Sequence, residues 1–215
     1  MEPERTFNET QRLYPFPHYP VFSSTKGKYP LVLTHSDSIL QLWGMGKAFR
    51  DDVSQTSYMN FKELQLEQFV HQVLQLDLKS SFPIYCSSID PNEQFIAASD
   101  TTKLYIFACI YDEEKVNLKK VHIKRIPTSG IIRMEFSSAG QLILAYSSGS
   151  IIVVDLHTKK FKEFTDHCYP NHGTIHSLTT SEDGQWLATS DTQNHIHVYN
   201  LDTMKVSFKI TNNIR

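Results

Sequence analysis

The sequence predicts an all-β protein built from repeated four-stranded units. A polar turn, an apolar strand, a second turn and another apolar strand follow one another three times, in "DPNEQFIAASDTTKLYIFAC", "SSAGQLILAYSSGSIIVVDL" and "SEDGQWLATSDTQNHIHVYNLD". The glutamines that precede the apolar strands, Gln94, Gln141 and Gln185, are 47 and 44 residues apart. The chain of 215 residues is 40% hydrophobic and 20% charged, which is typical of a globular protein. A repeated β unit with its own core-forming strands is therefore expected.

Each copy divides into four strand-like pieces separated by turn residues. The copies read "FPIYCSSI", "QFIAASD", "KLYIFACIYD" and "NLKKVHIKRI"; then "GIIRMEFS", "QLILAYS", "SIIVVDL" and "KKFKEFT"; then "GTIHSLTT", "QWLATS", "HIHVYNL" and "MKVSFKIT". Continuous apolar runs such as "SIIVVDL" are typical of strands covered on both faces. Four strands in about 40–45 residues indicate a WD40-type β-propeller blade, which is covered on both faces by its neighbours.

A further blade begins near the start of the chain. "YPLVLTHSDSILQLWGMG", from Tyr29, matches the second and third strands of a blade, with Trp43 at the position of the tryptophan in the WD dipeptide. We expect this blade to lack its innermost strand and to contain a long connection from Lys47 to about Phe69. The piece "QVLQLDL" alternates as an outer strand does, whereas "FKELQLEQF" before it fits either a short helix or a strand.

The expected organisation is a partial ring of about four blades. Because WD40 rings usually need more blades to close, we expect the chain to form part of a larger ring. The segments are an N-terminal segment at 1–28, a partial blade with a long connection at 29–80, and blades at 81–129, 130–172 and 173–215.

Charge and cysteine content limit the class of protein. The formal net charge is -2, which argues against nucleic-acid binding through overall charge but permits a local basic patch. Three cysteines without a CxxC spacing favour a reducing compartment. The N-terminus lacks the apolar core of a signal peptide, and no apolar run approaches the ~18 residues of a membrane span. We therefore expect a soluble, intracellular protein without membrane contact.

The joint pattern of four motifs resembles the cirhin family of WD40 scaffolds. The motifs are "LQLWGMG" (40–46), "IYCSSIDPNEQFIAAS" (84–99), "LKKVHIKRIP" (118–127) and "SEDGQWLATSDTQNHIHVYNLDTMKV" (181–206), and their order and gaps are similar to a stretch of the family's second propeller. The resemblance implies a non-catalytic protein of the nucleus and nucleolus that assembles with the small-subunit processome on the 5′ external spacer of pre-ribosomal RNA. The implied partners are propeller and helical-repeat subunits, with pre-rRNA contacted directly or through them, and the implied process is 18S rRNA maturation.

Lysines on the outer strands are the candidate contact residues for RNA or an acidic partner. They form two groups in neighbouring blades: Lys119, Lys120, Lys124 and Arg125, and then Lys159, Lys160 and Lys162. Phosphate binding would use such a basic rim. The alternative is that lysines on exposed edge strands prevent edge-to-edge aggregation. We also expect partners to contact the long connection after Trp43 and the loop from Thr165 to Gly173.

Two aspartates and two tryptophans are expected to have structural roles. Asp100 and Asp191 follow the second strand of a blade, where a carboxylate can accept hydrogen bonds that hold the turn. Trp43 and Trp186 are expected to pack between blades.

Catalytic and metal-binding patterns were also considered. His167, Cys168, His172 and His176 lie close in sequence, and His195 and His197 share a strand, but their spacing fits no standard zinc site. Cys86 and Cys109 lie in apolar strands, where thiols are usually inert. No GxGxxG or GxxxxGK[ST] motif is present. We expect no enzyme activity, metal, cofactor or small-molecule substrate; the alternatives are a propeller in a ubiquitin ligase receptor or trafficking coat, and a metal-dependent hydrolase.

Overall fold

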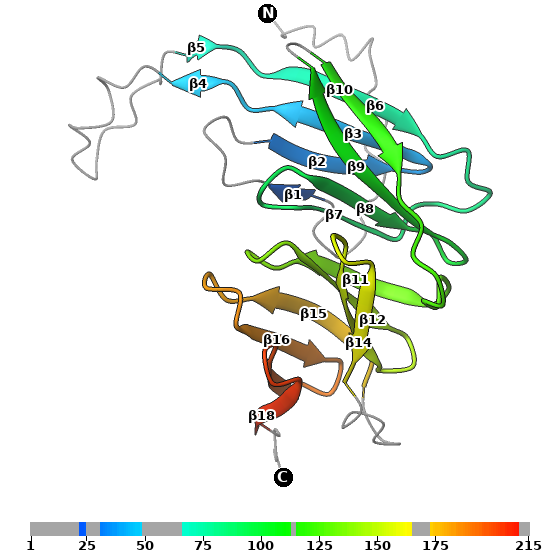
Figure 1. The fold of residues 1–215 in the computed structure, drawn as a ribbon, viewed down its shortest axis with the longest axis vertical. Coiled ribbons are helices and arrows are strands. Elements are labelled where there is room, and N and C mark those ends of the chain that lie inside the picture. Colours follow the sequence, from blue (N-terminus) through cyan, green and yellow to red (C-terminus); the bar gives the residue numbers. More distant parts are fainter. Residues whose placement is uncertain (1–21, 25–30, 49–65, 113–114, 165–172, 211–215) are drawn as a thin grey trace, which may run out of the picture.

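The described part of the chain forms four four-stranded antiparallel sheets, as predicted for a partial β-propeller. The structure is a computed structural model, and it describes residues 22–24, 31–48, 66–112, 115–164 and 173–210. Figure 1 shows the sheets following one another from the blue end of the chain to the red end. Within those ranges no helix is present, and hence none that could span a membrane.

Each sheet runs through its four strands in chain order. The first contains β1 (Phe22–Ser24), β2 (Leu31–Ser36), β3 (Ile39–Gly44) and β6 (His71–Asp77). The second contains β7 (Cys86–Ile89), β8 (Phe95–Ser99), β9 (Leu104–Asp112) and β10 (Lys115–Lys120). The third contains β11 (Ile131–Phe136), β12 (Gln141–Tyr146), β13 (Ile151–Asp155) and β14 (Lys160–Glu163). The fourth contains β15 (Ile175–Thr180), β16 (Trp186–Asp191), β17 (Ile196–Asn200) and β18 (Lys205–Ile210). We refer to these sheets as the first to the fourth blade.

The first blade differs from the sequence prediction in its innermost strand. The expectation that this strand is missing is wrong, because β1 pairs with β2 from Phe22 opposite Thr34 to Ser24 opposite Val32. Three residues, two of them serines, are too short to give a hydrophobic period. The long connection contains a small ribbon of β4 (Lys47–Ala48) and β5 (Leu66–Gln68). The end of "FKELQLEQF" is thus a strand, whereas residues 61–65 lie outside the described ranges.

Trp43 has the strand position of Tyr199 in the fourth blade, as predicted for the tryptophan of the WD dipeptide. Tyr199 lies opposite Leu187, points to the preceding blade and is separated from Val198 by a register irregularity. In the first blade the same irregularity separates Leu42 from Trp43, and Trp43 lies opposite Val32. Leu33 and Leu42 are buried against the second blade, which is the following one. Because successive residues of a strand point to opposite faces, Trp43 faces away from the second blade and is half-buried.

Three hydrophobic clusters fill the spaces between the blades. Between the first and second blades, Leu33, Leu42, Ile89 and Ile96 are at most 1% exposed. The largest cluster joins the second and third blades and includes Leu142 and Leu144. The third cluster joins the third and fourth blades. Its buried side chains include Ile143, Ile151, Val153, Phe164, Leu187 and Tyr199. The second and third blades are therefore covered on both faces.

Polar side chains on the inner strands also join neighbouring blades. Glu135 of β11 accepts hydrogen bonds from the backbone N–H (3.1 Å) and the hydroxyl (3.2 Å) of Thr180 in β15. Burial raises the pKa of Glu135, although both of these hydrogen bonds act in the opposite direction. Arg133 donates from Nε to the carbonyl of His176 at 2.9 Å, and its guanidinium lies 5.9 Å from the centre of the Tyr85 ring. These contacts fix the positions of three successive blades around the inner edge.

Replacing Leu142 by alanine tests the interblade core. Leu142 is fully buried between the second and third blades, so we expect Leu142→Ala to lower the free energy of unfolding by about 2–5 kcal/mol. Chemical denaturation monitored by circular dichroism measures this loss. Ile110→Ala is the control because Ile110 is 51% exposed. Equal destabilisation by both variants would contradict the assignment of the core.

His35 lies in the seam between the first and second blades. Its Nδ1 is 2.7 Å from the hydroxyl oxygen of Ser87 in β7. Burial lowers the pKa of His35 from 6.5 to about 4. In the unfolded chain the histidine binds a proton at a higher pH than in the fold, so protonation favours unfolding. Stability should fall as the pH drops from about 6.5 towards 4.

The substitution His35→Asn removes this titration. An asparagine amide can replace Nδ1 as a partner for Ser87, so the seam keeps a hydrogen bond. Between pH 7 and pH 4.5, we expect the melting temperature of the variant to decrease by less than that of the unsubstituted protein. Differential scanning fluorimetry measures both decreases. The same loss in both proteins would show that His35 does not account for the acid sensitivity.

Candidate functional site

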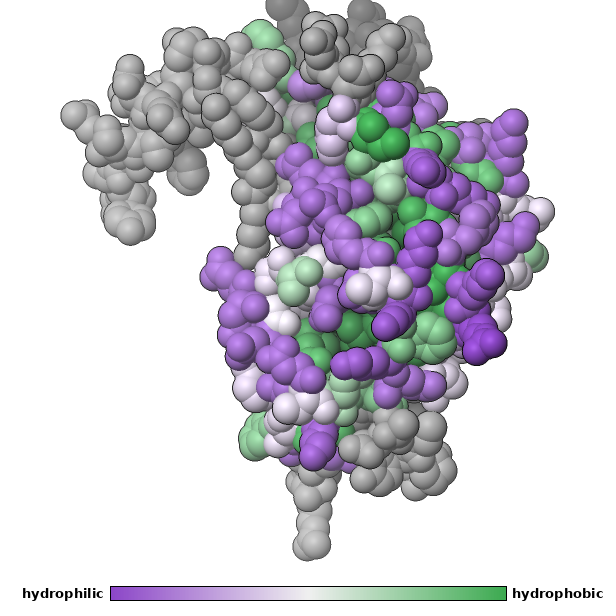
Figure 2. All heavy atoms as spheres, viewed as in Figure 1, coloured by the Kyte–Doolittle hydropathy of each residue, from purple (hydrophilic) through white to green (hydrophobic). Residues whose placement is uncertain are grey.

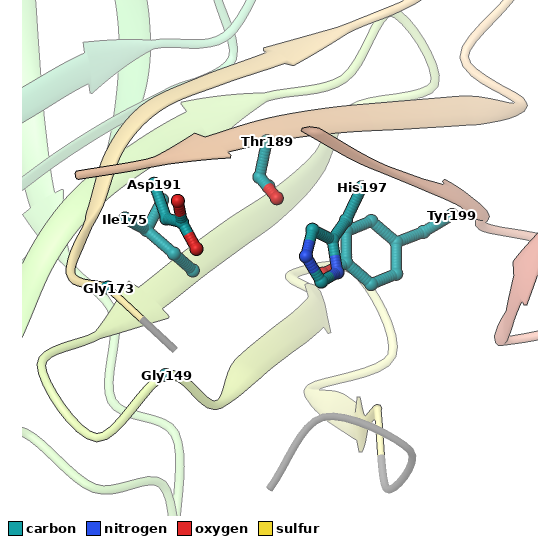
Figure 3. Close-up of a pocket in the computed structure, with 7 residues that line it drawn as sticks. All are labelled: Gly149, Gly173, Ile175, Thr189, Asp191, His197 and Tyr199. Carbon is teal, nitrogen blue, oxygen red and sulfur yellow. The ribbon is translucent and has the colours of Figure 1, made fainter. Parts of the chain in front are cut away.

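A small pocket lies between the third and fourth blades. It is lined by Gly149, Gly173, Ile175, Thr189, Asp191, His197 and Tyr199, and Figure 3 shows these residues coming from both blades and the turns beside them. Its volume of about 20 Å³ is enough for about one water molecule. Cofactor pockets are roughly 300–1,000 Å³. The pocket is therefore suited to a structural water and is too small for an organic substrate.

The polar groups of this pocket are suited to hydrogen bonding rather than catalysis. Burial raises the pKa of Tyr199 to about 12, although a hydrogen bond with Thr189 acts in the opposite direction. At neutral pH the phenol is therefore protonated. The rings of His197 and Tyr199 are stacked, with their centres 6.2 Å apart. Both rings belong to β17, and Tyr199 also packs against Phe164 of the third blade, with ring centres 5.0 Å apart, which holds the fourth blade against the third.

Asp191, at the edge of this pocket, organises the turn between β16 and β17. Its Oδ1 accepts hydrogen bonds from the backbone N–H groups of Gln193 and His195, both at 2.9 Å. Its Oδ2 is 3.2 Å from Nδ1 of His195. Burial alone would raise the pKa of Asp191, but the hydrogen bonds from His195 and Gln193 outweigh it and hold the pKa below its usual value. These contacts support a structural role for Asp191.

Asp100 has the same position and a larger set of partners in the second blade. Its Oδ1 accepts from the backbone N–H and hydroxyl of Thr102 (2.6 and 2.9 Å) and from the N–H of Lys103 (2.7 Å). Its Oδ2 accepts from the hydroxyls of Ser80 (2.5 Å) and Tyr105 (3.0 Å). Burial would raise the pKa of Asp100, yet the bonds from Ser80, Thr102 and Lys103 lower it to about 2. The carboxylate thus joins the turn to the segment that precedes β7.

The third blade uses a different residue at this position, which the sequence comparison missed. The backbone N–H of Tyr146 donates to the carbonyl of Ser150, as that of Asp191 donates to the carbonyl of His195. The hydroxyl of Tyr146 then donates to the carbonyl of Pro127 at 2.8 Å. A tyrosine is longer than an aspartate and reaches the preceding loop instead of its own turn. The only sequence signal for this difference is "AYSSGS". It contains a turn as long as the one that begins at Asp191, but without an acidic residue.

The seven basic residues predicted as a contact rim lie at the surface on two neighbouring blades. Lys119 and Lys120 are exposed on β10, and Lys124 and Arg125 are exposed in the segment that follows. Lys159, Lys160 and Lys162 are exposed on or beside β14. Among the residues that the structure describes, none of the seven forms a salt bridge, although Lys120 lies 5.8 Å from the centre of the Tyr105 ring.

Both basic groups border the seam between the second and third blades. Val121 and Ile123, which alternate with Lys120 and Lys124, pack against the cluster between these blades. Phe161, between Lys160 and Lys162, packs against the same cluster from the other side. The apolar side chains therefore fill the seam. Lys160 and Lys162 are on the other face of β14, towards the fourth blade, because Lys162 lies opposite Val153, which packs against that blade. Figure 2 shows hydrophilic and hydrophobic residues intermixed over one face of the molecule.

The thiol and histidine candidates do not form a reactive site in the described residues. Burial raises the pKa of Cys86 and of Cys109 to about 12, so neither is a thiolate at neutral pH. Within the described ranges, no three His, Cys, Asp or Glu side chains are grouped in a way that could hold a metal ion. His195 and His197 have ring centres 6.5 Å apart. The remaining candidates, His167, Cys168 and His172, lie outside the described residues, as do most of the two segments expected to contact partners.

Comparison with known proteins agrees with the geometry of the blades. The WD domain, G-beta repeat family matches residues 161–200, from the outer strand of the third blade to the third strand of the fourth. The chain is therefore a partial WD40-type β-propeller.

Two curated proteins are similar along almost the whole chain. The U3 small nucleolar RNA-associated protein 4 homolog of Homo sapiens, also called cirhin, is 28% identical over 207 residues, which are 94% of this chain and 29% of that protein. The protein of the same name from Mus musculus is 27% identical over 209 residues, again 94% of this chain and 29% of the relative. The chain is homologous to these proteins and spans less than a third of their length.

Asp100→Ala tests the structural role of the turn. The substitution leaves the buried hydroxyl of Tyr105 and part-buried donors of Ser80, Thr102 and Lys103 without their acceptor, so we expect a loss of about 1–3 kcal/mol in the free energy of unfolding. Because the pKa of Asp100 is lowered in the fold, the contribution is complete above the unfolded pKa near 3.8 and disappears as the pH falls towards 2. Denaturation at pH 7 measures the loss, with exposed Asp202 replaced by alanine as the control. A stability equal to that of Asp202→Ala would contradict the role assigned to Asp100.

Proposed function

We propose that the chain is a non-catalytic scaffold in ribosome biogenesis, acting with the small-subunit processome in 18S rRNA maturation. The observation that carries this proposal is the similarity to the U3 small nucleolar RNA-associated protein 4 homologs over 94% of the chain. Assembly would take place on the 5′ external spacer of pre-rRNA, in the nucleolus. Other propeller subunits and helical-repeat subunits of the processome would be the protein partners.

The surface features support a binding role. The interior of each blade is occupied by packed side chains, and the pocket between the third and fourth blades has room for about one water molecule. Exposed apolar side chains lie where the long connection rejoins the first blade, with Phe69 78% and Val70 49% exposed, and on the β9–β10 hairpin, with Ile110 51% and Tyr111 49% exposed. Apolar side chains on projecting hairpins are suitable contacts for a protein partner.

The basic rim supports direct contact with RNA. Lys119, Lys120 and Arg125 of the second blade and Lys160 and Lys162 of the third are exposed on or beside the outer strands of neighbouring blades. A phosphate backbone that crosses the outer edges of both blades would contact both groups. The net charge of -2 makes such binding local rather than a property of the whole surface.

Affinity purification from cells tests the assigned process. The tagged chain should recover small-subunit processome proteins together with 5′ spacer RNA, identified by mass spectrometry and sequencing. Recovery of a ubiquitin ligase or a trafficking coat without pre-rRNA would leave the propeller fold intact and exclude the proposed process. A tagged unrelated WD40 protein serves as the control for contacts that any propeller makes.

Neutralising the rim tests direct RNA contact. We expect the triple variant Lys119→Gln, Lys120→Gln and Lys160→Gln to bind a 5′ spacer RNA fragment more weakly. The slope of log affinity against log salt concentration should decrease by up to about 2, close to 0.7 for each lost contact with single-stranded RNA. Fluorescence anisotropy over a range of salt concentrations measures both quantities.

The control replaces three other exposed lysines, Lys103, Lys205 and Lys209, by glutamine. It has the same net charge as the test variant, so it corrects for the effect of total charge. Equal affinity and salt slope in the two triple variants would contradict direct contact at the rim. The lysines would then serve only to protect exposed edge strands from pairing.

A further inference from the structure

The inner edge of the second and third blades carries two exposed aromatic rings and an arginine. Tyr85, which immediately precedes the inner strand β7, is 43% exposed, and Phe82 in the segment leading to it is 47% exposed. The guanidinium of Arg133 in β11 lies 5.9 Å from the centre of the Tyr85 ring. The inner strands β7, β11 and β15 are side by side (Figure 1). We call Phe82, Tyr85 and Arg133 the inner-edge cluster.

The exposure of the two rings does not result from a missing blade. The first and third blades, on either side of the second, both lie within the described ranges and pack against it. Between the rings, Ile84 is 6% exposed and belongs to the hydrophobic cluster between the first and second blades. The interior position of this segment is thus filled, while Phe82 and Tyr85 remain in contact with solvent. Two exposed rings three residues apart form more than a scattered surface residue.

Hydrogen bonds hold the segment that carries the rings. The hydroxyl of Ser80 accepts from the backbone N–H of Phe82 at 3.1 Å and donates to Asp100 at 2.5 Å. The backbone N–H of Tyr85 donates to the carbonyl of Ser99 at 2.8 Å. Because both ends of the segment are held in place, little conformational entropy is lost when a ligand contacts the rings.

The neighbouring blade orients the arginine. Nε of Arg133 donates to the carbonyl of His176 in β15 at 2.9 Å, and the guanidinium lies beside the ring of Tyr85. The carboxylate of Glu135, two residues further along β11, is bound by the backbone N–H and hydroxyl of Thr180. The cluster therefore combines an oriented cation with two exposed aromatic faces.

Unpaired nucleobases have the chemistry that fits this combination. Every base has a flat face that stacks on an aromatic ring or on a guanidinium plane, and a guanidinium also binds phosphate. Stacking requires an exposed ring and no deep cavity. Bases in a duplex are already stacked on one another, so the cluster suits a single strand.

An acidic peptide is a poorer match for the same surface. It would use the cation of Arg133 but would leave the rings of Phe82 and Tyr85 without a specific partner. The exposed residue Asp37 also borders the segment, because its carbonyl accepts from the backbone N–H of Ile84 at 2.7 Å. A negatively charged side chain there repels an acidic peptide, whereas neutral bases are unaffected.

We propose that the inner-edge cluster stacks the bases of single-stranded RNA. Phe82 and Tyr85 each provide a platform for one base, and Arg133 binds a phosphate or a base plane beside Tyr85. The inference rests on the proposed function for the class of ligand, RNA, but it concerns a different surface. Lysines of the basic rim lie on the outer strands and contact phosphates, whereas the inner-edge cluster contacts bases.

Removing both rings tests the proposal. The probe is a fluorescein-labelled single-stranded RNA oligonucleotide of mixed sequence, and fluorescence anisotropy measures its binding to the full chain. We expect Phe82→Ala combined with Tyr85→Ala to weaken binding by about tenfold or more. The slope of log affinity against log salt concentration should stay the same, because no phosphate contact is lost. Replacing both residues by tryptophan should preserve binding, because an indole ring also stacks on bases.

The matched control removes two exposed rings elsewhere, through Tyr111→Ala combined with Trp186→Ala. Tyr111 is 49% exposed and Trp186 is 38% exposed. The expectation that Trp186 packs between two described blades is wrong: Leu187 points to the third blade, so the adjacent Trp186 lies on the open side of the sheet. Circular dichroism compares the folding of all variants.

Weaker binding by the test variant alone, with an unchanged salt slope, is the expected result. Equal affinity of the test and control variants, or no binding of the RNA by the unsubstituted chain, would overturn the proposal. So would binding of a labelled polyglutamate peptide, in place of RNA, that depends on Phe82 and Tyr85.

Ultraviolet crosslinking of the unsubstituted chain to the same RNA gives a second measurement that does not depend on the folding of a variant. Mass spectrometry should locate crosslinks at Phe82 or Tyr85, and crosslinks confined to other peptides would contradict the proposal. Failure of the proposed function is distinguishable from failure here. The rim variant is recognised by its reduced salt slope, and recovery of processome components is measured in a separate purification.

Discussion

The sheets of the second, third and fourth blades have apolar side chains on both faces, and each therefore depends on neighbouring sheets to cover them. Leu142 and Ile143 illustrate the constraint: they are adjacent in β12, point to opposite sides and are both fully buried, one against the second blade and the other against the fourth. A single blade would expose both of these faces to water. Stability is consequently shared between blades, as in other proteins built from repeats.

Polar contacts determine how the blades are oriented once the apolar faces are covered. Hydrophobic packing is non-directional, so it does not by itself fix the angle between two sheets. Glu135 and Arg133 supply direction, because each extends from β11 and binds β15 through a backbone group. At the outer side, the stacked His197 and Tyr199 rings lie in a pocket with too little space for a ligand. The polar groups between blades thus have structural roles, and the surfaces left for binding are the rims and the exposed hairpins.

The sequence predicted the repeated strands well because apolar strands and polar turns are local signals. β12 and β13 were recognisable from "QLILAYS" and "SIIVVDL", and their continuous burial agrees with that pattern. β1 was missed because it is short, with two serines among its three residues, and is held by pairing with β2 rather than by a hydrophobic pattern. Trp43 has the strand position that the motif predicted, but no described blade covers its side of the first blade, and its side chain is only half-buried.

The candidate site was predictable only in part, for a related reason. The turn aspartates Asp100 and Asp191 could be identified from their position after a strand, but the contact of Asp100 with Ser80 joins segments 20 residues apart and is visible only in the fold. Tyr146 gave no signal because a tyrosine and an aspartate have little in common in sequence. A partial ring implied uncovered faces at its ends, but the sequence did not show which side chains of the fourth blade lie on the open face. "QWLATS" and "QLILAYS" look alike, yet the first belongs to a sheet with one covered face and the second to a sheet with two. Burial on a given face is a property of the neighbouring blade, and a sequence pattern can specify that such a neighbour is needed without identifying it.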